Sequence, residues 1–211
     1  MKILILGAAG ELAGKVTEAL LKQTKAELVL YARDASKRLK LSDKEREKTV
    51  DGDFKDMDKL KEALNGINIV YLNTFDDKEG VETIVKAMQD TGVKRIIGAT
   101  SLGIYDEVPG KFGEWNKEML GDTLSDVANS TKVLEDSSLD YTLLRMSWLY
   151  NDVIKTKYEL THKGEPFKGA QVSRDAVAQL VVDIVKDDSK FIGKSLGVGE
   201  PDTDWDKPSF Y

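Results

Sequence analysis

The sequence predicts an α/β fold in which a doubly wound parallel sheet carries helices on both faces. Short apolar runs alternate with segments of helical periodicity from residue 1 to residue 100, and this alternation favours parallel strands joined by right-handed crossovers. The first run, residues 3–6, consists only of isoleucine and leucine, as expected of a strand that is buried on both faces. A glycine-rich turn follows that run at once.

This turn contains Gly7 and Gly10, and the segment after it places Leu12 and Val16 at helical spacing. A strand, a glycine turn and a helix bring unpaired backbone N–H groups and the positive end of a helix dipole to one point. Such a point suits an anion, most often a pyrophosphate. The spacing departs from the common G-x-G-x-x-G pattern, but Ala13 is small enough to let the helix pack closely on the strand. A turn without a ligand is the alternative interpretation.

The rest of the first half continues the alternation. Apolar and β-branched runs predict strands at residues 27–33, 49–52, 68–73 and 95–100, and helical spacing predicts helices at 56–64 and from about 81 to Gly92. Asp34 or Ser36 is available to cap a short helix or turn after the second strand. Residues 42–48 are highly charged, which indicates a solvated loop or an exposed helix.

The second half is less regular. Residues 102–123 contain several glycines and aromatic residues and are expected to form a long loop, and residues 158–172 a loop or hairpin. Helices are predicted at 124–137 and after the N-cap residue Ser173, and strands at 140–148 and 195–198. The aromatic tail, residues 201–211, is expected to pack back on the surface. We therefore expect one domain spanning residues 1–211, with 102–123 and 149–172 as loops on the substrate side.

Composition narrows the function classes. The net charge is −6, which argues against general binding of nucleic acid or anionic membranes. The chain has no cysteine, so disulfides, thiolate metal ligands and cysteine nucleophiles are excluded. Acidic residues show no metal-ligand spacing, and no apolar run has the length of a membrane span or signal peptide. We expect a cytoplasmic protein with a small-molecule substrate, and the sequence carries no signal for oligomeric state.

Several motifs, in this order, make the chain resemble the atypical short-chain dehydrogenases/reductases, the NAD(P)-binding group that includes NmrA-like proteins and flavin/biliverdin reductases. They are Gly7-Ala-Ala-Gly10, Tyr31-Ala-Arg33-Asp34, Asp51-Gly-Asp53, Leu72-Asn-Thr74, Thr100-Ser101, Leu139-Asp-Tyr-Thr-Leu-Leu-Arg145 and Ser173-Arg-Asp-Ala-Val177. The resemblance covers nearly the whole chain. It implies a Rossmann-type fold and an NAD(P) cofactor.

The end of the second strand bears on the choice of cofactor. NAD-binding proteins place an acidic residue there for the ribose hydroxyl, whereas this chain has Ala32 followed by Arg33. A guanidinium would bind the 2′-phosphate of NADP through paired, charge-assisted hydrogen bonds, and Lys37 and Arg38 add positive charge nearby. NADP is therefore favoured. The alternatives are NAD, with Asp34 as the ribose acid, and a solvated Arg33 without a ligand.

The resemblance also implies further cofactor contacts, residue by residue. Asp53 and Phe54 match the adenine edge of the site, and Asn73 and Thr74 lie where the ribose and nicotinamide side would run. The full set of expected cofactor positions is Gly7, Ala9, Gly10, Glu11, Leu12, Arg33, Lys37, Arg38, Asp53, Phe54, Asn73, Thr74 and Ser101. Asp53 as a strand-end cap and Asn73 as a turn former are the competing interpretations.

Short-chain dehydrogenases use a serine after the fifth strand and a Tyr-x-x-x-Lys pair in which the lysine lowers the tyrosine pKa. By resemblance Ser101 takes the place of the serine and Lys132 that of the lysine, but Ala128 stands where the tyrosine is expected. Tyr105 matches a tyrosine of extended members and is the candidate substitute. Packing of Tyr105 over the cofactor and a solvated Lys132 are the alternatives.

Three function classes follow. The first is an oxidoreductase that transfers hydride between NADP(H) and a small quinone-, flavin- or carbonyl-type acceptor. The second is a regulatory protein that senses NAD(P) without turnover, which the missing tyrosine favours. An NAD-dependent epimerase or dehydratase is a third, although the short second half leaves little room for a nucleotide-sugar lobe.

Overall fold

The computed structural model describes residues 1–211 as one eight-stranded sheet, a two-stranded sheet and seven helices. Strand order in the large sheet is β3-β2-β1-β4-β5-β6-β10-β8, and every pairing is parallel except that of β8 with β10. These strands are β1 (Lys2–Leu6), β2 (Glu27–Ala32), β3 (Glu47–Asp51), β4 (Ile69–Leu72), β5 (Arg95–Ser101), β6 (Asp140–Met146), β8 (Glu159–His162) and β10 (Lys194–Gly199). The order reverses between β1 and β4, which is where ligands bind in doubly wound sheets.

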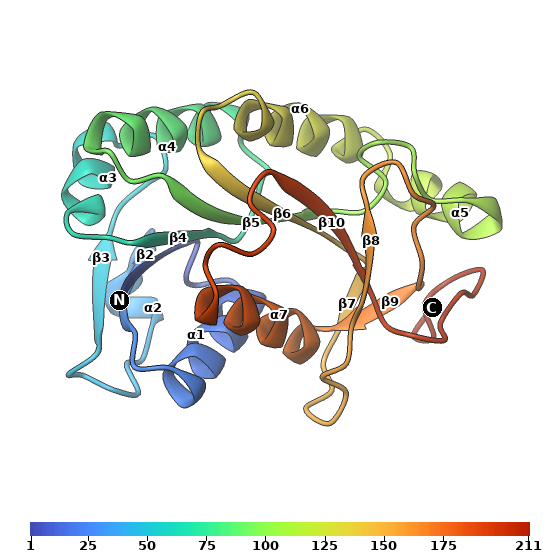
Figure 1. The fold of residues 1–211 in the computed structure, drawn as a ribbon, viewed down its shortest axis with the longest axis horizontal. Helices are drawn as coiled ribbons and strands as arrows, with labels where there is room; N and C mark the ends of the chain where they lie inside the picture. Colours follow the sequence, from blue (N-terminus) through green and yellow to red (C-terminus); the bar gives the residue numbers. More distant parts are fainter.

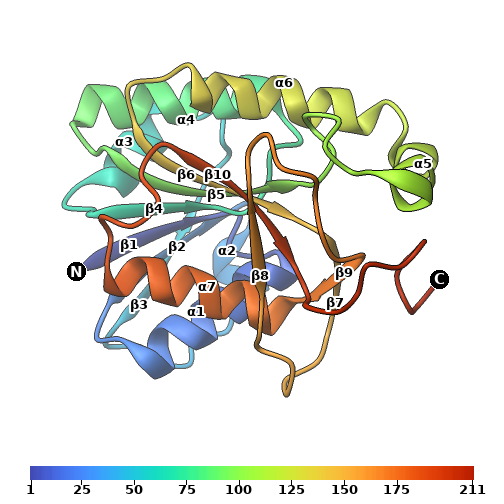
Figure 2. The ribbon, with the colours of Figure 1, turned by 45° about the vertical axis from the view of Figure 1, so that its right-hand side comes forward.

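Helices cover both faces of the sheet, as Figures 1 and 2 show. One face carries α1 (Glu11–Gln23) and α7 (Arg174–Lys186), and the other carries α3 (Met57–Leu64), α4 (Lys78–Thr91) and α6 (Thr123–Glu135). Two apolar clusters fill the space between the sheet and these layers. The predicted doubly wound Rossmann-type fold is confirmed.

Local sequence signals set many of the boundaries. Asp56, Asp77 and Ser173 each accept a backbone N–H from the first turn of the helix that follows, and Gly92 ends α4 in a left-handed conformation. Asp34 does not cap α2 (Ala35–Arg38), since its side chain accepts no hydrogen bond from the helix and lies 3.6 Å from the Lys37 ammonium. The Asp51 carboxylate instead accepts the Ser36 N–H at 3.1 Å.

The second half differs from the prediction in its details. The expected loop at 102–123 contains the helix α5 (Gly110–Leu120), and the expected loop or hairpin at 158–172 contributes β8 to the large sheet. The strand predicted at 140–148 ends at Met146, and a small parallel sheet joins β7 (Trp148–Tyr150) to β9 (Gln171–Ser173). Glycine-rich composition misled the prediction here because α5 packs an amphipathic face onto a small separate apolar cluster.

The aromatic tail packs back onto the molecule, as expected. It lies beside β7 and β9, below α5, in both views of the ribbon (Figures 1 and 2). The Tyr211 ring contacts Trp115 of α5 and Trp148 of β7 at centroid distances of 5.1 and 5.2 Å. None of the seven helices combines the length and the apolar character that a membrane span requires.

Candidate functional site: a dinucleotide crevice and an aromatic cavity

Strand register brings the predicted site residues together. Leu6 at the end of β1 pairs with Tyr31 of β2 on one side and with Leu72 of β4 on the other. The residues that follow these strand ends, Gly7 and Asn73 among them, therefore meet at one edge of the sheet. This edge holds the carboxyl ends of the parallel strands, the expected position of a ligand crevice.

The glycine turn is built for a close approach of a ligand to the backbone. Gly7 has φ of +78°, a conformation that a residue with a side chain rarely adopts. A Cβ atom at Gly10 would collide with the side-chain amide of Asn73. No side chain caps the start of α1, so the N–H groups of its first turn stay free for an anion.

A cavity of about 540 Å³ opens over this turn and crosses the ends of β1, β2, β3 and β4. It is lined by Gly7, Ala9, Gly10, Ala32, Arg33, Arg38, Gly52, Asp53, Phe54, Asn73, Thr74, Asp76 and Asp77. Nine of the thirteen predicted cofactor positions are in this set. We call it the cofactor cavity.

Its outer end carries the two arginines that the sequence singled out. The side chain of Arg33 is 78% exposed, and its Nε lies 4.0 Å from the Asp53 carboxylate. The Arg38 guanidinium donates to the Arg33 carbonyl oxygen at 3.2 Å. Lys37, by contrast, does not line the cavity. A guanidinium held by only one distant carboxylate can take up a phosphate at little cost.

Asp53 and Phe54 form the wall next to these arginines. The Tyr31 hydroxyl donates to the Asp53 carbonyl oxygen at 2.7 Å, and the Tyr31 and Phe54 rings stack at 6.4 Å. Burial, followed by the nearby charges of Asp56 and Asp53, raises the pKa of Tyr31 far above its usual value. The Asp53 carboxylate also accepts the Lys55 N–H at 3.0 Å, so Asp53 caps the turn as well as lining the cavity.

Four expected cofactor positions lie outside this lining: Lys37, Ser101, Leu12 and Glu11. Leu12 is buried in the apolar core beneath α1. The Glu11 carboxylate accepts a hydrogen bond from Asn151 at 2.7 Å and lies 3.1 Å from the Arg174 guanidinium. The side chains of these two residues are thus committed elsewhere, and only their backbone N–H groups at the start of α1 are placed for an anion.

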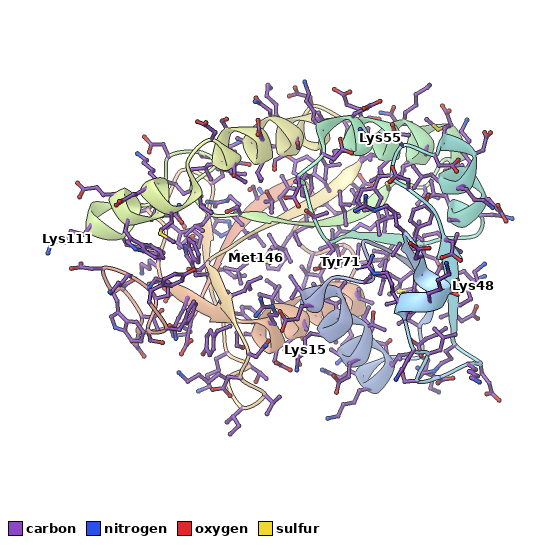
Figure 3. All side chains as sticks on the ribbon, turned by 180° about the vertical axis from the view of Figure 1, so that it is seen from behind. Lys15, Lys48, Lys55, Tyr71, Lys111 and Met146 are labelled. Atoms are coloured by element: carbon purple, nitrogen blue, oxygen red, sulfur yellow. The ribbon has the colours of Figure 1, made fainter.

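A second cavity of about 460 Å³ continues from the first and shares Asn73, Thr74 and Asp76 with it. It is lined further by Phe75, Ala99, Thr100, Ser101, Leu102, Leu120, Val127, Met146, Ser147, Trp148, Leu149, Arg174, Phe210 and Tyr211. Met146, at the end of β6, is labelled near the middle of the molecule in Figure 3, whereas Lys111 is labelled at the outer tip of α5. We call this mostly apolar space the acceptor cavity.

Of the three predicted catalytic residues, only Ser101 lines the acceptor cavity. Tyr105 lines neither cavity. Its hydroxyl donates to Glu135 at 2.7 Å and lies 3.1 Å from Ser195, and its ring packs against the Arg145 guanidinium at 5.2 Å. Burial raises the pKa of Tyr105 far above its usual value, which is the opposite of what the proton donor of a dehydrogenase requires.

Lys132 is also remote from the two cavities. Its side chain is 68% exposed on α6, and its ammonium pairs with Asp136 one helical turn on, at 2.9 Å. That hydrogen bond raises the pKa of Lys132. The structure therefore does not bring Ser101, Tyr105 and Lys132 together, because the loop after β5 turns Tyr105 towards β6 and β10 and α6 presents Lys132 to solvent.

Sequence reasoning missed the far wall of the acceptor cavity. Arg174, Phe210 and Tyr211 belong to the start of α7 and to the tail, and nothing in their local sequence indicates that they line the same cavity as Ser101. It also missed the reason for Tyr105's position, a buried ion pair between Arg145 and Glu107. Glu107 accepts the backbone N–H groups of Gly103 and Tyr105, and this pair therefore fixes the loop after β5.

The uncapped helix start, the left-handed Gly7 of the turn and the two arginines that line the cavity all fit a dinucleotide. Fold and cavity thus define a nucleotide-binding protein of the Rossmann class. The profile of a family described as NAD(P)H-binding matches residues 7–188, and the chain belongs to that family. Among curated proteins, no sequence matches this chain.

Solved structures agree with this assignment. A short-chain dehydrogenase/reductase from Veillonella parvula, in complex with NADP, is 38% identical, with a TM-score of 0.95 and 99% of each chain covered. A Rossmann-fold NAD(P)-binding family protein from Shigella flexneri is 35% identical, with a TM-score of 0.82, covering 100% of this chain and 98% of that one. ChuY from Escherichia coli O157:H7, an anaerobillin reductase, shares the fold at 21% identity, with a TM-score of 0.83, covering 99% of this chain and all of that one. The predicted resemblance to the atypical short-chain dehydrogenases/reductases is confirmed.

Proposed function

We propose that this protein is an NADPH-dependent oxidoreductase that reduces a small conjugated acceptor of the quinone or flavin type. The observation that carries this proposal is the acceptor cavity, which adjoins the cofactor cavity and has an aromatic wall but no Tyr–Lys pair beside Ser101. Bound NADPH supplies the hydride, and the reduced acceptor takes its proton from solvent. A conjugated acceptor stabilises the developing anion within its own ring system and needs little acid help.

The residues of the chain divide the work between binding and positioning. The glycine turn and the first turn of α1 hold the pyrophosphate, and Arg33 and Arg38 hold the 2′-phosphate. Asn73 and Thr74 line both cavities, so they position the two reactants relative to each other. The neighbour from Veillonella parvula in complex with NADP supports the choice of NADP over NAD.

Ser101 is the one predicted catalytic residue that lines the acceptor cavity. Its hydroxyl donates to the Leu102 carbonyl oxygen at 3.1 Å, a weak local bond that a ligand can replace. We propose that Ser101 donates a hydrogen bond to an acceptor oxygen or nitrogen and orients it. Tyr105 and Lys132 have no part in the proposed reaction.

A panel of acceptors tests the proposal. Menadione, riboflavin and cyclohexanone are each offered with NADPH, and oxidation is followed at the nicotinamide absorbance. We expect menadione and riboflavin to react faster than cyclohexanone by roughly 10²–10⁴, the usual contribution of a general acid that the cavity lacks. If cyclohexanone reacts fastest, the cavity contains a proton donor and the proposal is wrong.

Regulation without turnover is the second candidate, and the absence of the Tyr–Lys pair from the acceptor cavity favours it. In that case NADPH binds tightly, no acceptor in the panel is reduced, and NADP⁺ and NADPH bind with different affinities. Calorimetry with both redox forms separates this function from the proposed reaction.

A further inference from the structure

The acceptor cavity has a wall that comes from the end of the chain. Phe210 and Tyr211 both line it, although they are 46% and 51% exposed. Large aromatic side chains left half-exposed at the mouth of an apolar cavity offer ring faces that a ligand can cover. The rest of the cavity consists of strand ends, the segments that follow them, and positions in α5, α6 and the start of α7, so these two rings are its only part from the tail.

The tail is fixed in place by hydrogen bonds of its backbone and of its polar side chains. Ser209 donates to the buried Gln171 side chain twice, from its N–H at 2.9 Å and from its hydroxyl at 2.8 Å. Earlier in the tail, the Asp204 carboxylate accepts the Gly169 N–H at 2.9 Å, and the Thr203 carbonyl oxygen accepts the Ala170 N–H at 2.7 Å. The two rings therefore stand on an anchored segment, and replacing one of them leaves the anchors unchanged.

The ring of Tyr211, next to that of Phe210, adjoins Trp148, whose side chain is held by a hydrogen bond. The Trp148 indole donates to the Asn116 side chain at 2.9 Å, and this bond sets the plane of the indole against α5. Tyr211 meets Trp148 edge to face at 5.2 Å, and Phe210 lies 5.4 Å from Tyr211 and 5.9 Å from Tyr150. This ordered aromatic wall can accept a flat ring at modest entropic cost, because aromatic side chains have few rotatable bonds.

We propose that Phe210 and Tyr211 are the specificity-determining residues of the acceptor cavity, and that they select planar conjugated ring systems over saturated carbonyl compounds. This inference rests on the proposed function, since it assigns the acceptor to this cavity. The contact is between ring faces and edges, so the Tyr211 hydroxyl is not required for it. Stacking of this kind contributes binding free energy beyond that of apolar burial. The additional contribution corresponds to roughly a tenfold change in affinity.

The chain provides a matched control for these two residues. Trp205 is a third aromatic residue of the same tail and is 44% exposed. It lines a different cavity, of about 300 Å³, between the start of α5 and residues 166–170. A change at Trp205 therefore removes a comparable aromatic surface from the tail without touching the acceptor cavity.

The test measures binding without turnover. The protein is saturated with NADP⁺, and riboflavin is titrated while the quenching of its own fluorescence is recorded. We expect Tyr211→Ala and Phe210→Ala each to raise the dissociation constant of riboflavin about tenfold. Tyr211→Phe and Trp205→Ala should stay within about twofold of the wild type, and the affinity for NADP⁺ should not change in any of the four.

The outcomes separate this inference from the proposed function. Equal affinities of the wild type and both alanine variants, or no riboflavin binding by the wild type, would overturn the inference. So would a loss in Tyr211→Phe as large as that in Tyr211→Ala, because the hydroxyl would then carry the contact. If the alanine variants lose riboflavin but the wild type never oxidises NADPH with any acceptor, the aromatic wall stands and the proposed reaction is wrong.

Discussion

The two halves of the chain differ in what they bury. Of the fifteen buried polar or charged residues, only Glu47, Arg95 and Thr100 belong to residues 1–101, and the other twelve belong to residues 102–211. The first half is thus held together almost wholly by apolar side chains. The second half encloses the ion pair of Arg145 with Glu107, several hydroxyl groups and the Glu200 carboxylate, and both carboxylates face partners far away in the sequence.

The two halves of the chain also supply different parts of the site. The first half supplies the turns at strand ends that line the cofactor cavity, whereas the second half supplies most of the residues that line the acceptor cavity. An apolar interior tolerates exchange of one hydrophobic residue for another of similar volume. A buried polar interior requires each partner in its place. We therefore expect substitutions in the two halves to have different effects on stability and binding.

The largest effect is expected at the buried ion pair of the second half. Arg145 is fully buried, and Glu107 is 5% exposed at its side chain. Replacing Arg145 by Met keeps the apolar stem but leaves the Glu107 carboxylate buried without its cation, which should lower the free energy of unfolding by about 3–5 kcal/mol. Urea denaturation followed by circular dichroism measures this loss.

The exposed pair of Lys132 and Asp136 provides the control. It joins the same kinds of charge at 2.9 Å, but its side chains are 68% and 62% exposed, so Lys132→Met should leave stability almost unchanged. The double variant Arg145→Met/Glu107→Gln should recover part of the loss because the unpaired charge is gone. Equal losses in Arg145→Met and Lys132→Met would show that burial is not what gives the first pair its importance.

The same contrast explains which features of the fold and the site could be predicted from the sequence. Residues 3–6, the glycine turn and Ser173 as an N-cap act through neighbours in sequence, so local patterns sufficed for the fold and for most of the cofactor cavity. Tyr105 was expected in the crevice because it follows β5 closely. Its position is set instead by Glu107 and Arg145, 38 residues apart, and no local pattern encodes such a pairing.

The aromatic wall of the acceptor cavity could not be predicted from the sequence for the same reason. The rings of Trp148 and Tyr211 are 63 positions apart in the sequence and meet only after β7 pairs with β9 and Gln171 takes up Ser209. The helix α5 was missed because its glycine content masked an amphipathic face. Arg174 was noted only as part of a helix start, and its contact with Glu11 depends on how α1 and α7 pack.

The next prediction concerns the glycine turn of the first half. A valine at Gly10 would displace the Asn73 amide, which lines both cavities. We expect Gly10→Val to weaken NADPH binding at least a hundredfold, or about 2.7 kcal/mol, as measured by calorimetry. Gly14 lies on the same helix with nothing within 4 Å of a Cβ atom, so Gly14→Val should bind NADPH as the wild type does. Retained binding by a folded Gly10→Val protein would remove the cofactor from this turn.

A smaller effect is expected at the outer end of the cofactor cavity. Arg33→Asp places a carboxylate where the 2′-phosphate of NADP would lie, and the loss of a charge-assisted contact should weaken NADPH binding about tenfold while NADH binding is maintained or improved. Lys37→Asp changes a nearby residue that does not line the cavity and is the matched control. Similar affinities of the wild type for NADPH and NADH would contradict the assigned role of Arg33.

The smallest effect is expected from a buried carboxylate beside the tail. Glu200 accepts hydrogen bonds from the Tyr150 hydroxyl, from Lys155 at 2.7 Å and from Gln171 at 3.1 Å, and Gln171 in turn holds Ser209. Burial alone would raise the pKa of Glu200, but these hydrogen bonds outweigh it and hold the pKa below its usual value of 4.5. A carboxyl group with a lowered pKa in the folded state stabilises the protein fully above the unfolded value.

That contribution must disappear on acidification. As the pH falls through the lowered pKa of Glu200, the folded protein takes up the proton and the contribution is lost. The variant Glu200→Gln lacks the charge at every pH, so it should be less stable than the wild type by about 1 kcal/mol at pH 7. The difference should shrink as the pH falls from 4.5 through the lowered pKa of Glu200, because the other carboxyl groups titrate alike in both proteins. A difference in unfolding free energy that stays constant from pH 7 downwards would mean that amide geometry, and not the charge of Glu200, secures the hydrogen bonds around Gln171 and the tail.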